Sequence, residues 1–220
     1  MRAVSRFSIF IALALFLASL AFESRLAFGD EIVLPPPATD GGMGLFTALK
    51  KRSSVSGADV SPAEVTLEEL STVLWAASGL NRGQTGWTVP MAEGLPPYVR
   101  IYVAGPAGVW RYEWDGHKLS EVSGDNIKGA VAAQSFVQKA WYVLILVSDK
   151  EGAGKLRGGA GAADNFIQVL TGAMTQDIYL AAASLGLGAR YIHSMKTEAI
   201  EKALSLPPED YPVALMLLGR

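Results

Sequence analysis

The sequence of 220 residues contains no cysteine and only two histidines, and charged residues make up no more than 18% of it. Without cysteine the chain has no disulfides, thiolate metal ligands, cysteine nucleophile or acylated lipoprotein-type cysteine. Two histidines argue against a metal site built from several histidine ligands. The formal net charge of −2 provides no overall positive charge for nucleic acid. We therefore expect neither a metal site nor a nucleic-acid partner.

The N-terminus has the pattern of a secretory signal. Arg2 and Arg6 precede the 16-residue stretch Phe7–Phe22, which carries no charge. A membrane-spanning helix needs about 20 apolar residues, so this stretch is short for one. We predict a signal peptide at residues 1–29, cleaved after Gly29 or earlier, and an exported, periplasmic protein with no stable membrane span. The alternative is an uncleaved segment that anchors the chain to the membrane.

The mature chain divides into an extended leader at residues 30–43 and one domain at residues 44–220. Three consecutive prolines and two glycines exclude a helix in the leader. A short helix is predicted at Met43–Arg52. A second helix begins at Thr66, which forms a capping box with a glutamate three residues later, and ends at Gly79.

Hydrophobic residues make up 50% of the chain, which is enough for a packed core. Strands are predicted at Tyr98–Ala104, Val109–Trp114, Lys118–Val122, Trp141–Val147, Ala189–His193 and Tyr211–Leu218. Helices are predicted at Asn165–Leu185 and Lys196–Leu204. The helix at Asn165–Leu185 carries few charges, so we expect it to be buried on all sides, in the core or against a partner subunit. The fold class is α+β.

Most candidate catalytic residues have a structural explanation. The glycines of residues 149–163 fit neither the dinucleotide fingerprint nor a P-loop, so we expect a mobile surface loop there. His117, beside a hairpin turn, is expected to be solvated. No serine lies in a nucleophile-elbow motif. His193 ends a strand and is harder to dismiss.

The segment Lys50–Ser54 is the one stretch with a clear chemical pattern. Two lysines and an arginine are followed by two serines. Such a set can bind a phosphate through a forked guanidinium and short hydroxyl hydrogen bonds. It is also what a basic helix C-terminus looks like when it complements the helix dipole.

Five segments in order resemble the FMN-dependent nitroreductase family. Arg52–Ser56 resembles its opening R-x-S-x-R element, and Leu74–Arg82 is similar to its LLWAA.GiNR block. Thr88–Ala92 stands where the family has T-A-P-S-A. Gly172–Gly188 resembles the segment GAxxQNxxLAAxxLGLG, and Leu218–Arg220 resembles the closing strand. The resemblance covers about residues 32–220.

This resemblance implies a homodimer with a central, mostly antiparallel sheet wrapped by helices. It also implies two FMN molecules per dimer, bound between the subunits. The flavin takes electrons from NADH or NADPH and passes them to a small-molecule acceptor such as a nitroaromatic or a quinone. Because the flavin performs the chemistry, no catalytic side chain is expected.

The family's binding residues can be matched to this sequence one by one. Arg52 and Ser54 match the family's phosphate and ribityl ligands, and Ser53 lies between them. Ser56 stands where the family usually has a second basic residue. The loop that reaches the partner's flavin falls on Pro90, Met91 and Ala92. His193 and Ser194 match the turn whose backbone amides face flavin N5. Arg220 matches a basic residue that contacts the phosphate in many relatives. The chain departs from the pattern at Ser56, Met91, Gly94 and Asp177.

We therefore expect an exported FMN-dependent oxidoreductase of the nitroreductase type. Its electron donor is a reduced nicotinamide or, because nicotinamides are scarce outside the cytoplasm, another donor. Two alternatives remain. The departures at Ser56, Met91 and Gly94 favour a flavin-binding or interaction protein of the same fold with weakened or lost activity. A flavoenzyme that modifies a peptide is also compatible with the LLWAA block.

Overall fold

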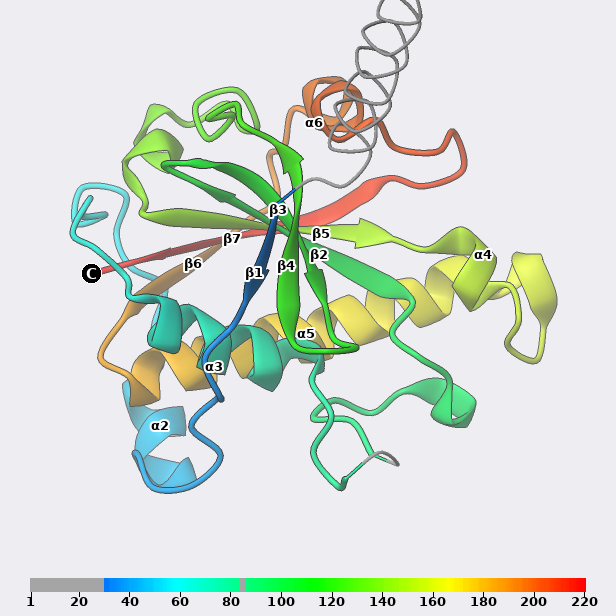
Figure 1. Cartoon of the computed structure of the whole chain (residues 1–220), viewed down its shortest axis with the longest axis horizontal. Coiled ribbons are helices and arrows are strands. Elements are labelled where there is room, and N and C mark those ends of the chain that lie inside the picture. Colours follow the sequence, from blue (N-terminus) through cyan, green and yellow to red (C-terminus); the bar gives the residue numbers. More distant parts are fainter. Residues whose placement is uncertain (1–29, 84–85) are drawn as a thin grey trace, which may run out of the picture. The chain divides into compact units, whose positions relative to one another are not determined.

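The computed structural model describes residues 30–83 and 86–220. The predicted signal peptide at residues 1–29 lies outside the described residues. The compact unit Glu31–Arg220 holds all the helices and strands described below (Figure 1).

The core of this unit is one seven-stranded sheet in which every neighbouring pair is antiparallel. Its order is β1-β4-β3-β2-β5-β7-β6. The strands are β1 (Glu31–Val33), β2 (Val99–Gly105), β3 (Gly108–Glu113), β4 (Lys118–Ser123), β5 (Tyr142–Ser148), β6 (Gly188–Ile192) and β7 (Pro212–Gly219). All six strands predicted from the sequence are present, and the antiparallel sheet is confirmed.

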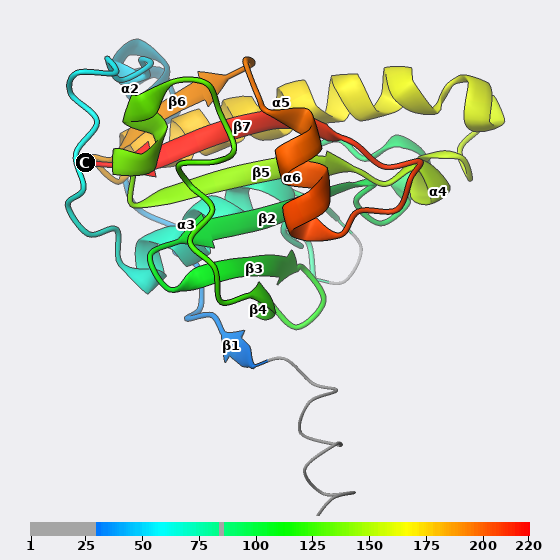
Figure 2. The same ribbon diagram turned by 90° about the horizontal axis from the view of Figure 1, so that it is seen from above.

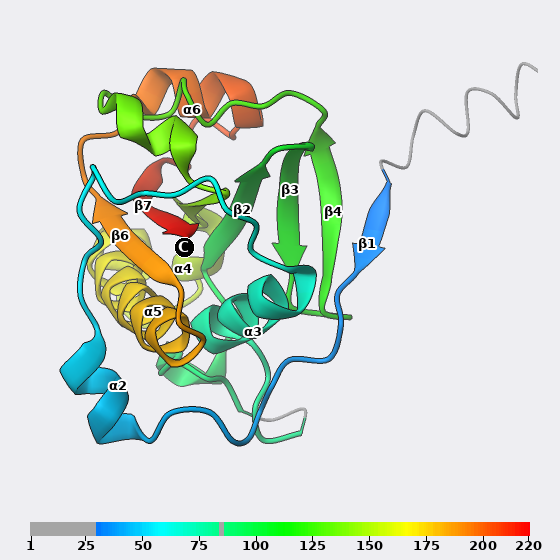
Figure 3. The same cartoon turned by 90° about the vertical axis from the view of Figure 1, so that its left-hand side faces the viewer.

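Helices cover both faces of the sheet (Figures 2 and 3). The α-helices are α2 (Leu45–Lys51), α3 (Leu67–Ser78), α4 (Lys150–Ala153), α5 (Ala163–Ser184) and α6 (Thr197–Leu204). Short 3-10 helices lie at η1 (Ala92–Gly94), η2 (Ser135–Lys139) and η3 (Gly159–Gly161). Successive side chains of β5 point to opposite faces of the sheet. Leu144 and Leu146 pack with α3 and α5, whereas Val143 and Ile145 pack with α6.

The ends of α3 are set by local sequence, as predicted. Thr66 accepts from the Glu69 amide and Glu69 accepts from the Thr66 amide, which completes the capping box. Gly79 is the C-cap, and its amide donates to the Trp75 carbonyl. A Cβ at Gly79 would lie 2.3 Å from the Trp75 ring, so only glycine allows this close exit.

Two segments differ from the sequence prediction. Glu31–Val33 of the leader is not merely extended, because it pairs with β4 as the edge strand β1. The mobile loop predicted at residues 149–163 is wrong as a description. Asp149 caps α4 by accepting from the Gly152 amide at 2.9 Å, and both Ala153 and Leu156 are buried in the core.

The helix α5 is buried along one face only. Ile167, Met174 and Ile178 are fully buried, whereas Val169 is 74% exposed. Complete burial inside the single chain is therefore wrong, and burial against a partner stays a prediction. Among residues 30–83 and 86–220, no helix, α5 included, is long and apolar enough to cross a membrane.

Candidate functional site

The segment Arg52–Ser56 leaves α2 and runs beside β6. Ser54 forms a parallel bridge with Ala189, and the Val55 amide donates to the Ala189 carbonyl at 3.0 Å. The Arg190 guanidinium donates to the Val55 carbonyl at 2.8 Å. These bonds hold the serine-rich segment extended, so that its side chains have fixed directions.

Tyr179 of α5 organises the side chains of this segment. Its hydroxyl accepts from the Tyr191 amide at 2.7 Å and lies 2.7 Å from Ser54 Oγ. Either hydroxyl can donate this bond, and the other hydroxyl then keeps its own proton for a ligand. The Arg52 guanidinium lies over the Tyr179 ring, 5.0 Å from its centroid.

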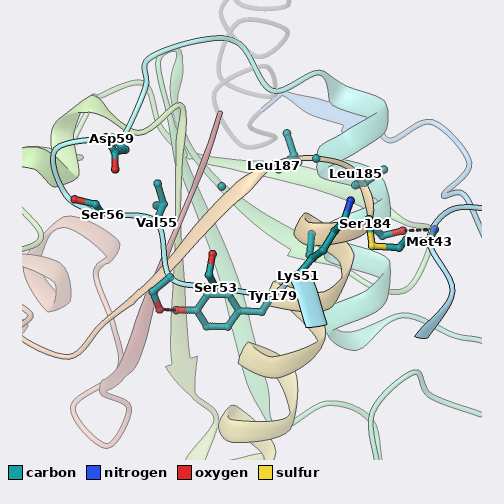
Figure 4. A pocket seen from close by; sticks show the side chains of 14 residues that line it. Met43, Lys51, Ser53, Val55, Ser56, Asp59, Tyr179, Ser184, Leu185 and Leu187 are labelled. Atoms are coloured by element: carbon teal, nitrogen blue, oxygen red, sulfur yellow. Dashed lines mark hydrogen bonds between the residues drawn. The ribbon is translucent and has the colours of Figure 1, made fainter. Parts of the chain in front are cut away.

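A cavity of about 820 Å³ opens beside this segment. Ser53, Ser54 and Ser56 line one side, and the turn Gly186–Gly188 lines another (Figure 4). The Lys51 side chain extends along its wall. One cation and three hydroxyls thus lie where the sequence predicts a phosphate and a polyol chain, and the carboxylate of Asp59 lines the cavity as well. Within the described residues, no group of three or more histidines and acids could hold a metal.

The predicted flavin-facing turn lies beyond the end of β6 and does not line this cavity. His193 is exposed and stacks on Tyr191, with ring centroids 6.4 Å apart. Ser194 Oγ accepts from the side-chain amide of Gln134. The other side-chain atom, Gln134 Oε1, is buried with no partner among the described residues. Gln134 therefore offers a buried, unused acceptor beside this turn. Nothing in the sequence singled it out.

Pro90, Met91 and Ala92 lie far from Arg52–Ser56 in this chain. The first two line a separate cavity of about 410 Å³ with Trp87 and Gly94. The next residue, Glu93, accepts from the Arg157 amide at 3.0 Å, which places the loop near the N-terminal end of α5. The serine cavity is lined by Lys51 of α2 and by residues at the C-terminal end of α5. That end of α5 lies beside α2 (Figure 1).

Arg220 lies at the N-terminal end of α3. Its guanidinium donates to the Glu64 carbonyl at 3.0 Å and forms an ion pair with Glu69. A phosphate contact would require Arg220 to leave Glu69, so its binding role stays a prediction.

His117 is not the solvated residue that the sequence predicted. Its Nε2 lies 2.7 Å from Ser71 Oγ, and its Nδ1 lies 2.9 Å from the Tyr112 hydroxyl. Ser71 donates to the Pro35 carbonyl, so it accepts from His117 Nε2, and Nδ1 accepts from Tyr112. Burial lowers the pKa of His117. The neutral imidazole therefore ties the leader to α3 and to the β3–β4 hairpin.

The family model described as the nitroreductase family matches residues 49–220. A curated protein of Methanocaldococcus jannaschii named as a nitroreductase is 33% identical over 185 residues, covering 80% of this chain and 90% of its own length.

Solved structures agree with that match. A crystal structure from Ralstonia eutropha JMP134, described as a nitroreductase, aligns with a TM-score of 0.79 and 30% identity over 86% of this chain and 89% of its own. A structure from Exiguobacterium sibiricum 255-15, described as a nitroreductase in complex with FMN, has a TM-score of 0.58. It is 16% identical and covers 83% of this chain and 90% of its own, so it shows the fold alone.

Proposed function

Because this chain belongs to the nitroreductase family, we propose that it is an FMN-dependent oxidoreductase. It would take electrons from NADH or NADPH and pass them to a nitroaromatic, a quinone or a similar small acceptor. The observation that carries the proposal is the serine-lined cavity at the end of α2, with Lys51 on its wall and Arg52 next to it.

The side chains of this cavity suit the phosphate and ribityl parts of FMN. Lys51 on the wall and Arg52 beside Tyr179 would supply positive charge, and Ser53, Ser54 and Ser56 would supply hydroxyls. The hydroxyl proton that stays free in the Ser54–Tyr179 pair would be donated to the ligand. When bound, FMN would supply the two-electron chemistry, and the chain's own residues would bind and orient it. His193, Ser194 and Gln134 would lie near its ring.

We also propose that the site is completed in a homodimer. The outward face of α5 carries the exposed side chain of Val169 beside the small residues Gly172 and Ala173. On α2, the exposed fraction is 62% for Leu45 and 85% for Phe46. Two α5 helices packed antiparallel on this face would cover the apolar side chains. They would also bring the partner's Pro90–Ala92 loop to the serine cavity, because these features lie at opposite ends of α5.

A titration of the purified protein with FMN tests the flavin site. Arg52→Ala should weaken FMN by about 1.5–3 kcal/mol, the range for a hydrogen bond to a charged group. Lys202→Ala removes a positive charge from exposed α6 and is the matched control. If Arg52→Ala retains FMN as well as the parent and the control do, the phosphate assignment is wrong.

Two observations favour a second candidate, a flavin-binding or interaction protein with weakened activity. Arg220 is held by Glu69, and the position of the family's second base is Ser56. In that case FMN would bind weakly or remain oxidised when NADH or NADPH is added.

Export is part of the proposal and depends on residues 1–29, which carry the signal pattern. Fractionation of cells that express the full chain should recover a shortened protein from the periplasm. Recovery of the full-length chain in the membrane fraction would support the uncleaved anchor instead.

A further inference from the structure

A second cavity, of about 540 Å³, lies between the leader, α3 and α5. It borders the serine-lined cavity, because Ser184 and Leu185 line both. Its walls are Asp40–Gly42 of the leader, Trp75 of α3 and Asp177 of α5. The proposed flavin contacts do not line it.

The leader wall is held in place by backbone geometry. Gly41 and Gly42 have φ values of 73° and 68°, a conformation that L side chains rarely adopt. A Cβ at Gly42 would lie 2.8 Å from Ser184 Oγ, and the Met43 amide donates to the same oxygen at 2.9 Å. The glycines therefore let the leader close against α5 and form a defined wall.

Asp177 is the charged group of α5 in this cavity, and it has no hydrogen bond or ion pair within the described residues. Burial raises the pKa of Asp177 from 3.8 to about 6. Of the described residues that line the cavity, none is a lysine, arginine or histidine. A partly buried carboxylate without a compensating charge is unfavourable, and a cationic ligand would relieve that cost.

The polar groups on α3 and the following loop do not compensate the charge of Asp177. The Thr72 hydroxyl donates to the Glu68 carbonyl, and the Thr88 hydroxyl donates to the Trp75 carbonyl. The Trp75 indole N–H donates to the Leu80 carbonyl at 2.8 Å. These three protons are committed. The side chains of Asn81 and Ser184 also line the cavity, but they are neutral and cannot neutralise the charge of Asp177.

We propose that this cavity binds an organic ammonium ion with an apolar body. The charge would lie near Asp177, with Asp40 adding a second carboxylate at the leader wall. Trp75 offers an aromatic surface for a weakly hydrated cation, and Leu180 offers an apolar one. A bare divalent ion fits less well, because the described residues provide no group of three acids or histidines. This binding goes beyond the flavin chemistry and does not require it.

Isothermal titration calorimetry on the protein as purified, with benzyltrimethylammonium as the probe, tests the proposal. We expect one saturable site per chain at pH 7.5, with benzoate not binding there. Asp177→Asn should weaken the cation at least tenfold. Asp125→Asn, which removes an exposed carboxylate from the loop after β4, should leave the affinity unchanged. Trp75→Phe keeps a ring and should lose only a few-fold.

The pH dependence separates a specific ion pair from general attraction. Below about pH 6 Asp177 gains a proton, so the parent should lose affinity as the pH falls, and Asp177→Asn should show no such fall. Asparagine is the residue of the family pattern here, so this variant should fold, which a thermal melt checks. Its FMN affinity should match the parent's, so failure here is distinguishable from failure of the flavin proposal.

Three results would overturn the ammonium site. The first is equal affinity of the parent and Asp177→Asn for the probe. The second is benzoate binding as tightly as the cation. The third is dissociation of a homodimer by Asp177→Asn, which would mean that a partner subunit's own cation fills the cavity.

Discussion

At the residue scale, two acid–base groups are set by burial rather than by a catalytic neighbour. Asp177 faces a cavity without a partner, and His117 sits neutral between Ser71 and Tyr112. Desolvation disfavours the charged form of each, so the pKa of the acid rises and the pKa of the imidazole falls. Both shifts make stability depend on pH.

Asp177→Asn should stabilise the ligand-free protein at neutral pH. The folded state holds the proton of Asp177 up to about pH 6, whereas the unfolded chain loses it near 3.8. Stability from this group is therefore lost as the pH rises from 3.8 to 6, by up to about 3 kcal/mol. We expect ~1–2 kcal/mol, because the carboxylate is partly solvated. Urea unfolding at pH 8 should show this gain and unfolding near pH 3.5 should not. A gain equal at both pH values would contradict the assignment.

His193→Gln should leave turnover within about tenfold of the parent, which corresponds to less than about 1.4 kcal/mol in the barrier. The imidazole of His193 is exposed and stacks on Tyr191, and the family resemblance assigns the backbone amide to the flavin. His193→Pro removes that N–H and should alter the flavin potential or abolish binding. A loss of several orders of magnitude in His193→Gln, with FMN still bound, would show that the imidazole is catalytic.

At the scale of elements, the leader is attached to the domain at several points. β1 extends the sheet at β4, and Ser71 donates to the Pro35 carbonyl. Further along, the Ala38 amide donates to Thr72 Oγ1 at 3.0 Å. The leader is therefore a structural strap over α3, and it forms one wall of the second cavity.

His117→Gln should weaken the strap and remove its pH dependence. With the folded pKa below 6.5, the stability from neutral His117 is present above pH 6.5 and is lost as the pH falls below it. Proteolysis of the leader should therefore speed up near pH 5 in the parent. The variant should be cut faster than the parent at pH 8, because Ser71 and Tyr112 lose their hydrogen bonds to His117. Its cleavage rate should also depend less on pH. If protease sensitivity of the parent is the same at both pH values, His117 does not hold the strap.

The sequence predicts those elements whose pattern is local. The stripe of α3, its capping box and the continuous apolar run of β5 need no distant partner to be recognised. β1 has only three residues, and α4 has four, so neither carries a readable period. The segment Arg52–Ser56 was found because its residues are consecutive. The sequence gives no sign that Asp177 faces a cavity, and it wrongly suggests that His117 is solvated. The surroundings of both residues come from elements far apart in the chain.

At the scale of the whole molecule, the serine cavity and the Pro90–Ala92 loop lie at opposite ends of α5. One chain alone therefore brings together only part of the residues that the family resemblance assigns to FMN. The exposed apolar face of α5 and the exposed side chains of α2 provide a surface on which a second copy would unite them.

Val169→Glu should convert the proposed homodimer to a monomer, because it places a charge on the exposed apolar face of α5. FMN affinity should fall at least tenfold with it. Val122→Glu makes the same change on β4, at a side chain that is 37% exposed and far from α5, and is the control. Light scattering at micromolar concentration gives the mass. A parent that is monomeric with FMN bound would remove the dimer from the account.

The most direct test of the central claim is an anaerobic visible spectrum of the mature protein with FMN, recorded before and after addition of NADH and of NADPH. We expect one FMN bound per chain and loss of the oxidised flavin absorbance with one of the two nicotinamides. Return of that absorbance on addition of a quinone or a nitroaromatic would complete the cycle. Failure to bind FMN, or bound flavin that neither nicotinamide reduces, would contradict the proposed oxidoreductase.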